Sequence, residues 1–142
     1  MYFRYTGMRV RNLQRSIRFY TKVMGMKVHL QGRMWHGGEW VELKSPNSSQ
    51  ILELNYYPLG TKYHEKFRIG SELDHLAFWV KNVDRRYAHL LSKGAKEGIA
   101  PFQQGKYRFA FVKNPDGIWI ELLGRGKQAE PSGPLMCRRS MH

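Results

Sequence analysis

Short apolar runs separated by turn-forming residues dominate the pattern along this chain, and this pattern is typical of β-strands. The runs are rich in β-branched and aromatic residues. The longest begins with polar residues at Ser71 and continues as an almost unbroken apolar run to Val80. The strands that the pattern predicts cover residues 5–10, 26–30, 40–43, 50–55, 73–80, 95–99, 107–112 and 118–123.

Two segments show helical spacing instead of alternation. Asn12 and Asn82 precede the two apolar stripes and are predicted N-caps, because their side chains are able to accept from free backbone N–H groups. Gly25 and Gly94 are predicted to end the two helices. The first stripe consists of Leu13, Ile17, Tyr20 and Met24, extended by Phe19 and Val23, and the second of Val83, Tyr87, Leu90 and Leu91.

The predicted elements occur twice in the same order, and matching residues recur at an almost constant shift. The matches are Tyr5 with His75, Val10 with Val80, Asn12 with Asn82 and Arg15 with Arg85 at a shift of 70, Lys44 with Lys113 at 69, and Glu53 with Glu121 at 68. The repeat predicts an α+β fold of two βαβββ modules that pair about a pseudo-two-fold axis and face a shared cleft.

The module boundaries follow from a change in composition. Module 1 covers about 1–55 and module 2 about 71–124, and together they make one domain over 1–124. The stretch 56–70, which contains Tyr, Pro and Gly, is predicted to be a linker. Because such a linker could join modules within one site or between two chains, we expect a homodimer. The remaining residues 125–142 are predicted to be a mobile basic tail.

Three polar residues interrupt apolar strand patterns, which makes them candidates for a metal site. They are Glu53, His75 and Glu121. A buried carboxylate needs a partner charge or a metal, and the repeat places these positions toward the predicted cleft. Two carboxylates and one imidazole suit one divalent ion, with nickel, zinc, cobalt, manganese and ferrous iron as the alternatives. Tyr5, as the repeat partner of His75, is expected beside this site.

Composition narrows the classes of partner. The chain has 142 residues, 24 Lys and Arg against 11 Asp and Glu, and a net charge of +13. The basic residues are scattered and form no recognition helix, so nucleic acid is not the expected partner, and an anionic small-molecule substrate is. No apolar run is long enough to span a bilayer, no signal peptide is evident, and Cys137 is the single cysteine. We therefore expect no membrane partner and a cytoplasmic location.

Three stretches carry a resemblance to a known family. Residues 5–26, YTGMRVRNLQRSIRFYTKVMGM, are similar to the opening of glyoxalase I, or lactoylglutathione lyase. Residues 74–78, DHLAF, and residues 114–122, NPDGIWIEL, resemble its other two signatures. The resemblance covers residues 1–124 and implies the vicinal oxygen chelate superfamily, in which two βαβββ modules form a curved mixed-sheet cleft around a divalent metal.

The resemblance also implies roles for individual residues. Glu53, His75 and Glu121 match three metal ligands, whereas Tyr5 stands where the family has His or Gln. Arg9 matches an arginine that the family uses near the glutathione carboxylate. Further substrate-binding candidates are Tyr5, Asn55 and Tyr57, the last standing where the family has Asn.

The activity that the resemblance implies is a metal-dependent lyase or isomerase acting on a 2-oxo or hemithioacetal substrate through a metal-stabilised enediolate. Glu121 would be the catalytic base and Glu53 its opposite partner. Two alternatives stay open. One is another enzyme of the superfamily, an epimerase or a dioxygenase, although Glu53 departs from the two-His, one-Glu pattern of the dioxygenases. The other is a non-catalytic protein that binds a small ligand.

Overall fold

The computed structural model describes residues 1–126, and these form two compact units. The N-terminal unit consists of residues 4–77, and the C-terminal unit consists of residues 1–3 together with the described residues from 78 onward. The predicted basic tail over 125–142 lies outside the described residues except for its first two. The domain and linker boundaries drawn from the sequence remain predictions.

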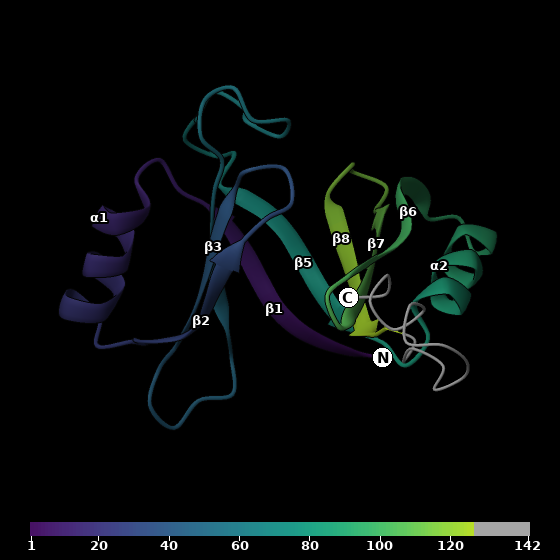
Figure 1. Ribbon diagram of the computed structural model, residues 1–142, viewed down its shortest axis with the longest axis horizontal. Helices are drawn as coiled ribbons and strands as arrows, with labels where there is room; N and C mark the ends of the chain where they lie inside the picture. The colour runs from purple at the N-terminus through teal and green to yellow at the C-terminus, as the bar shows by residue number, and fades with distance from the viewer. Residues whose placement is uncertain (127–142) are drawn as a thin grey trace, which may run out of the picture. The chain divides into compact units, whose positions relative to one another are not determined.

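The N-terminal unit holds the first set of strands, hydrogen-bonded in the order β2-β3-β4-β1-β5 (Figure 1). Strands β1 and β4 are parallel, with Gly7 opposite Glu53 and Arg9 opposite Asn55, while β3 is antiparallel to both β2 and β4. The elements are β1 (Tyr2–Arg9), α1 (Leu13–Arg18), the π-helix η1 (Phe19–Val23), β2 (Lys27–Arg33), β3 (Glu39–Lys44), β4 (Leu52–Tyr56) and β5 (Leu73–Trp79).

The C-terminal unit repeats this plan. The last residues of β5 belong to it, and its other strands follow in the hydrogen-bonded order β8-β7-β6, with β7 antiparallel to both neighbours. Helix α2 packs against β6, β7 and β8 (Figure 1). Its elements are α2 (Val83–Ser92), β6 (Lys96–Gln104), β7 (Tyr107–Lys113) and β8 (Trp119–Arg125). The predicted α+β class, with a βαβββ order that occurs twice, is confirmed.

Each unit has its own apolar core, and the two cores use matching positions. Burial classes agree position by position between residues 4–20 and residues 74–90. The core of the N-terminal unit contains Val10, Leu13, Val41, Leu43 and Leu54. The core of the C-terminal unit contains Val80, Val83, Ala110 and Leu122. The sequence repeat is therefore also a repeat of packing.

Both helices begin as their sequences predict. The Asn12 side-chain oxygen accepts from the backbone N–H of Arg15 at 2.9 Å, and the Asn82 oxygen accepts from that of Arg85 at 3.0 Å. Each cap satisfies one backbone donor that the first turn leaves open, which is worth about 1 kcal/mol.

The first helix ends differently from the prediction. The apolar stripe was expected to include Phe19, Val23 and Met24, but these side chains are 45%, 70% and 58% exposed. At this end the chain forms a π turn, in which the Met24 N–H donates to the Phe19 carbonyl five residues earlier. The exposure is not specific to this turn, because the matching positions 89, 93 and 94 of the second repeat are also exposed.

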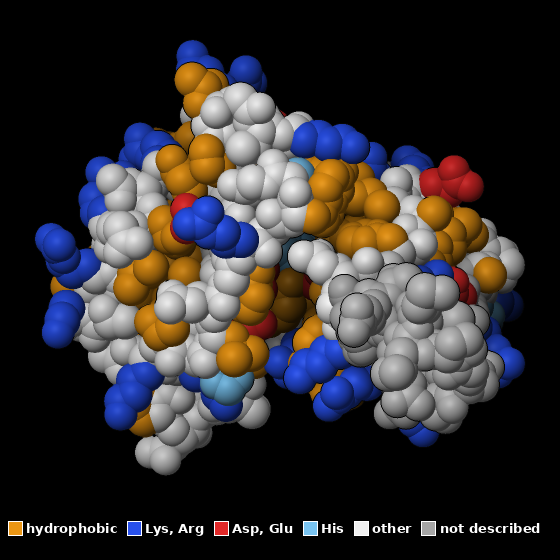
Figure 2. All heavy atoms as spheres, viewed as in Figure 1, with side chains coloured by type: hydrophobic (Ala, Val, Ile, Leu, Met, Phe, Trp, Pro, Cys, Tyr) orange, Lys and Arg blue, Asp and Glu red, His pale blue; other side chains and the backbone are white. Residues whose placement is uncertain are grey.

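Basic side chains are scattered over the surface, as they are along the sequence. Lys and Arg side chains, blue in Figure 2, are spread over the face shown. Among the residues of the described part, no helix is long and apolar enough to cross a membrane.

Candidate functional site

The N-terminal unit brings three of the predicted site residues together. Tyr5 lies on β1, Glu53 on β4 and His75 on β5, and β1 is hydrogen-bonded between the other two strands. All three are buried, with 4%, 6% and 6% of their surface exposed. Buried polar groups require hydrogen-bonding or ionic partners. These three side chains are partly partners for one another.

His75 is held at both ring nitrogens. Its Nε2 lies 2.7 Å from the Tyr5 hydroxyl, and its Nδ1 lies 2.8 Å from Oδ2 of Asp74. The Tyr5 and His75 rings meet edge to face, with centroids 5.2 Å apart. The Glu53 Oε1 atom lies 3.7 Å from the same Nε2, beyond hydrogen-bond distance but close enough for an electrostatic interaction.

Asp74 is the residue that the sequence analysis missed. Its Oδ2 also accepts from the Tyr57 hydroxyl at 2.7 Å, and its Oδ1 accepts from Arg9 at 3.2 Å. Burial alone would raise the pKa of Asp74, but the hydrogen bonds from His75 and Tyr57 and the charge of Arg9 lower it overall. Asp74 is therefore ionised at neutral pH and only accepts, so Nδ1 of His75 donates to it.

That assignment fixes the other side of the imidazole. In the neutral ring, a proton on Nδ1 leaves a lone pair on Nε2. When the ring is neutral, the Tyr5 hydroxyl therefore donates to Nε2. A carboxylate behind the imidazole is also the arrangement that orients metal-binding histidines in proteins.

A second set of contacts holds Glu53 and the ring face of His75. Asn55, two residues along β4 and fully buried, donates from Nδ2 to Glu53 Oε1 at 2.8 Å. Gly7 on β1 lies directly against the His75 ring, because a Cβ at this position would be 2.7 Å from two ring atoms. The signal for Gly7 was a glycine inside a strand pattern, which often marks a close approach.

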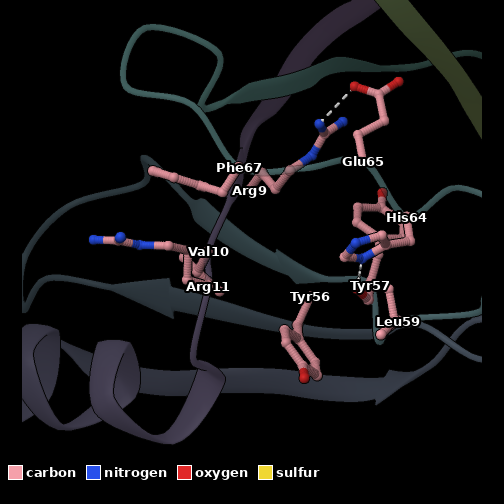
Figure 3. Close-up of a pocket in the computed structure, with 9 residues that line it drawn as sticks. All are labelled: Arg9, Val10, Arg11, Tyr56, Tyr57, Leu59, His64, Glu65 and Phe67. Atoms are coloured by element: carbon pink, nitrogen blue, oxygen red, sulfur yellow. Dashed lines mark hydrogen bonds and ion pairs between the residues drawn. The ribbon is translucent and has the colours of Figure 1, made fainter.

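Arg9 and Tyr57 connect this network to a pocket of about 200 Å³. Arg9 pairs with Glu65 at 2.9 Å, and its guanidinium lies over the Tyr57 ring, 5.6 Å from the centroid. Figure 3 shows Arg9 directed toward Glu65. The pocket is lined by Arg9, Val10, Arg11, Tyr56, Tyr57, Leu59, His64, Glu65 and Phe67.

Electrostatics keep two of these groups in single protonation states. Burial and the neighbouring Asp74 carboxylate raise the pKa of Tyr57, so its phenol keeps its proton. For Arg9, burial acts to lower the pKa, but Glu65 and Asp74 outweigh it and raise the pKa overall. The pocket wall therefore combines a permanent cation with a neutral phenol.

Glu121 lies in the other unit. It is on β8, opposite Phe111 of β7, and only 7% exposed. Its role as ligand and base remains a prediction.

A family model described as the glyoxalase/bleomycin resistance protein/dioxygenase superfamily matches residues 2–122. A lactoylglutathione lyase of Escherichia coli O157:H7 is 32% identical over 132 residues, covering 86% of this chain and 95% of that protein. A probable chloroplastic lactoylglutathione lyase of Arabidopsis thaliana is 30% identical in an alignment 143 positions long, which covers 92% of this chain and 37% of that protein.

Some of the similar proteins are much longer than this chain, and others are similar mainly in fold. The chain spans 37% and 46% of the length of two Arabidopsis relatives. Among solved structures, a methylmalonyl-CoA epimerase of Mycobacterium tuberculosis is similar, with a TM-score of 0.66 and 19% identity over 89% of each chain. That likeness shows a shared fold.

Proposed function

The chain belongs to the glyoxalase/bleomycin resistance protein/dioxygenase superfamily, and we propose that it is a metal-dependent lyase or isomerase that moves a proton within a small 2-oxo or hemithioacetal substrate. Members of this superfamily generally use a divalent metal, and the relatives compared above carry the names of enzymes. The expected family resemblance is thereby confirmed.

The observation that carries the proposal is the buried pair of Glu53 and His75. Oε1 of Glu53 and Nε2 of His75 are 3.7 Å apart, which is close enough for one ion to contact both donors. The lone pair on Nε2, with Asp74 behind Nδ1, has the chemistry of a metal-binding imidazole. These two donors would supply part of a divalent-ion site, for which nickel, zinc, cobalt, manganese and iron are the candidates.

The rest of the ligand set rests on the sequence repeat. Within residues 1–126, no three His, Cys, Asp or Glu side chains are grouped closely enough to hold a metal. Glu121, the repeat partner of Glu53, stays the predicted third ligand.

A bound divalent ion would polarise the substrate oxygens and make the neighbouring C–H more acidic. The carboxylates of the chain would then move the proton. One glutamate takes it from the carbon that bears sulfur and hydroxyl and returns it to the adjacent carbonyl carbon, so the isomerisation balances without an oxidant. Glu121 is the proposed base and Glu53 its opposite partner. Asn55 would hold the Glu53 carboxylate in place through its 2.8 Å hydrogen bond.

The pocket beside Asp74 supplies a place for the anionic part of such a substrate. Arg9 and Arg11 both line it, and Glu65, whose side chain is 71% exposed, is the partner that a substrate carboxylate would replace on Arg9. Tyr57 would form the wall of this pocket and Tyr5 the wall nearer the metal.

The homodimer remains a prediction of the sequence that light scattering would test.

The proposal is tested by metal content and turnover together. The protein is purified without added metal, loaded with each divalent ion in turn, and assayed with the hemithioacetal that glutathione forms with a 2-oxoaldehyde. His75→Ala should lose both bound metal and turnover, whereas His29→Ala, at an exposed position on β2, should keep both.

Two outcomes would contradict the proposal. Metal binding by His75→Ala equal to that of the wild type would show that the metal lies elsewhere. Stoichiometric metal without turnover of any 2-oxo or hemithioacetal substrate would instead favour a ligand-binding protein.

A further inference from the structure

The His75 imidazole has one nitrogen available for a ligand, and a side chain of this protein already occupies it. Nδ1 is bound to Asp74 at 2.8 Å. Nε2 lies 2.7 Å from the Tyr5 hydroxyl, which donates to it when the ring is neutral. An ion approaching Nε2 therefore meets a hydroxyl at the position where it must bind.

The ring of His75 has little freedom to turn away from Tyr5. Asp74 holds its Nδ1, and the backbone of Gly7 lies so close that an added Cβ would be 2.7 Å from the ring. That same Cβ would also be 2.8 Å from the Asn55 side-chain oxygen, so this side of the ring is closely packed. Freeing Nε2 thus requires a movement of Tyr5 rather than of His75.

Glu53 is held at a distance consistent with this arrangement. Its Oε1 is 3.7 Å from Nε2, and Asn55 donates to that oxygen at 2.8 Å. The hydroxyl of Tyr5, at 2.7 Å, lies a full ångström nearer to Nε2 than this carboxylate oxygen does.

We propose that Tyr5 sets the metal affinity of this site by competing for Nε2 of His75. The hydrogen bond from its hydroxyl must break before the imidazole coordinates a divalent ion, so metal binding includes the cost of displacing Tyr5. This inference rests on the proposed metal role of His75. It makes Tyr5 an element that tunes affinity rather than a ligand.

The experiment measures binding of Zn²⁺ and Ni²⁺ by calorimetry in the metal-free protein. Tyr5→Phe keeps the ring and removes only the hydroxyl, so it should bind metal about tenfold more tightly, the value of one buried neutral hydrogen bond. Tyr57→Phe is the matched control, because its hydroxyl bonds Asp74 and not Nε2. It should not tighten metal binding.

The outcomes separate this inference from the proposed function. Unchanged affinity in Tyr5→Phe, with metal still bound by the wild type, overturns the competition and leaves the metal site standing. Weaker binding in Tyr5→Phe also overturns it, because Tyr5 would then be a ligand. Equal tightening in Tyr57→Phe overturns it too, since loss of any hydroxyl in the network would suffice. No binding of either ion by wild type and variant overturns both. If Tyr5→Phe does not fold, Tyr5→Leu also lacks the hydroxyl and provides the same comparison.

Discussion

The two sequence repeats of this protein, β1 to β4 and β5 to β8 with their helices, share one fold but differ in chemistry. Burial agrees residue by residue over 4–20 and 74–90, and each repeat begins its helix with an asparagine cap. Yet the position that is Tyr5 on β1 is His75 on β5, and the position that is Gly7 is Ala77. Matching apolar positions give both repeats the same fold. A few buried positions on the same strands differ between the repeats, and these residues form the candidate site.

The helices of the two repeats also begin alike and end differently. Helix α2 runs regularly from Val83 to Ser92, whereas α1 covers only Leu13–Arg18 before the π-helix η1 takes over. Val23 and Met24 are exposed, and so are the matching positions 93 and 94 of the second repeat. Equivalent sequence patterns therefore give the same burial along both helices, although the hydrogen bonding of their last turns differs.

The largest effect should come from breaking the two cores at matching positions. Leu54 and Leu122 are both fully buried, one in each core. Alanine at either position removes packing and leaves a cavity, so each variant should lose about 3 kcal/mol of unfolding free energy. Urea unfolding measures both. A loss at only one position would show that the cores are not equivalent.

A smaller effect should distinguish Gly7 from its repeat partner Ala77. In Gly7→Ala the new methyl would press on the His75 ring, so we expect a loss of about 2 kcal/mol, in the range for overpacked sites. Ala77→Gly removes one buried methyl and adds backbone freedom, with an expected loss of about 1 kcal/mol. Urea unfolding again gives both values. Gly7→Ala with wild-type stability would show that the ring moves freely, against the argument for Tyr5.

The smallest effect should appear at the caps. Asn12→Ala and Asn82→Ala each remove one hydrogen bond to the third residue of the helix, so each should cost about 1 kcal/mol. The midpoint of thermal unfolding is sufficient to compare them. A clearly larger loss for one cap would mean that its unit depends more on its helix than the other does.

The repeat made the fold predictable, because period and turn residues are local signals. The βαβββ order, both caps and the grouping of Tyr5, Glu53 and His75 follow from it. Strand β6 was predicted only over 95–99 but runs Lys96–Gln104. Its pairing with β7 has two irregularities, one at Gly98 and one between Ile99 and Phe102. A Cβ on Gly98 would be 2.6 Å from the Phe111 carbonyl oxygen. Such bulges interrupt the simple alternation by which a strand is predicted.

The contacts around the site were less predictable because they are not local. Asp74 reads as the polar start of a strand, and its burial depends on Arg9 and Tyr57, which are 65 and 17 residues away. The same is true of Glu65, which lies in the stretch read as a linker and pairs with Arg9, 56 residues distant. Sequence spacing identified the strands that carry the site but not the partners that fix its charges.

The most direct test of the account follows the two nitrogens of His75 by ¹⁵N NMR while Zn²⁺ is added to histidine-labelled protein, with His75→Ala used to assign the signals. The account predicts that the Nε2 resonance changes on metal binding, as the Tyr5 hydroxyl is replaced, while Nδ1 keeps its proton and its hydrogen bond to Asp74. Saturation with Zn²⁺ that leaves both His75 nitrogens unchanged would contradict it.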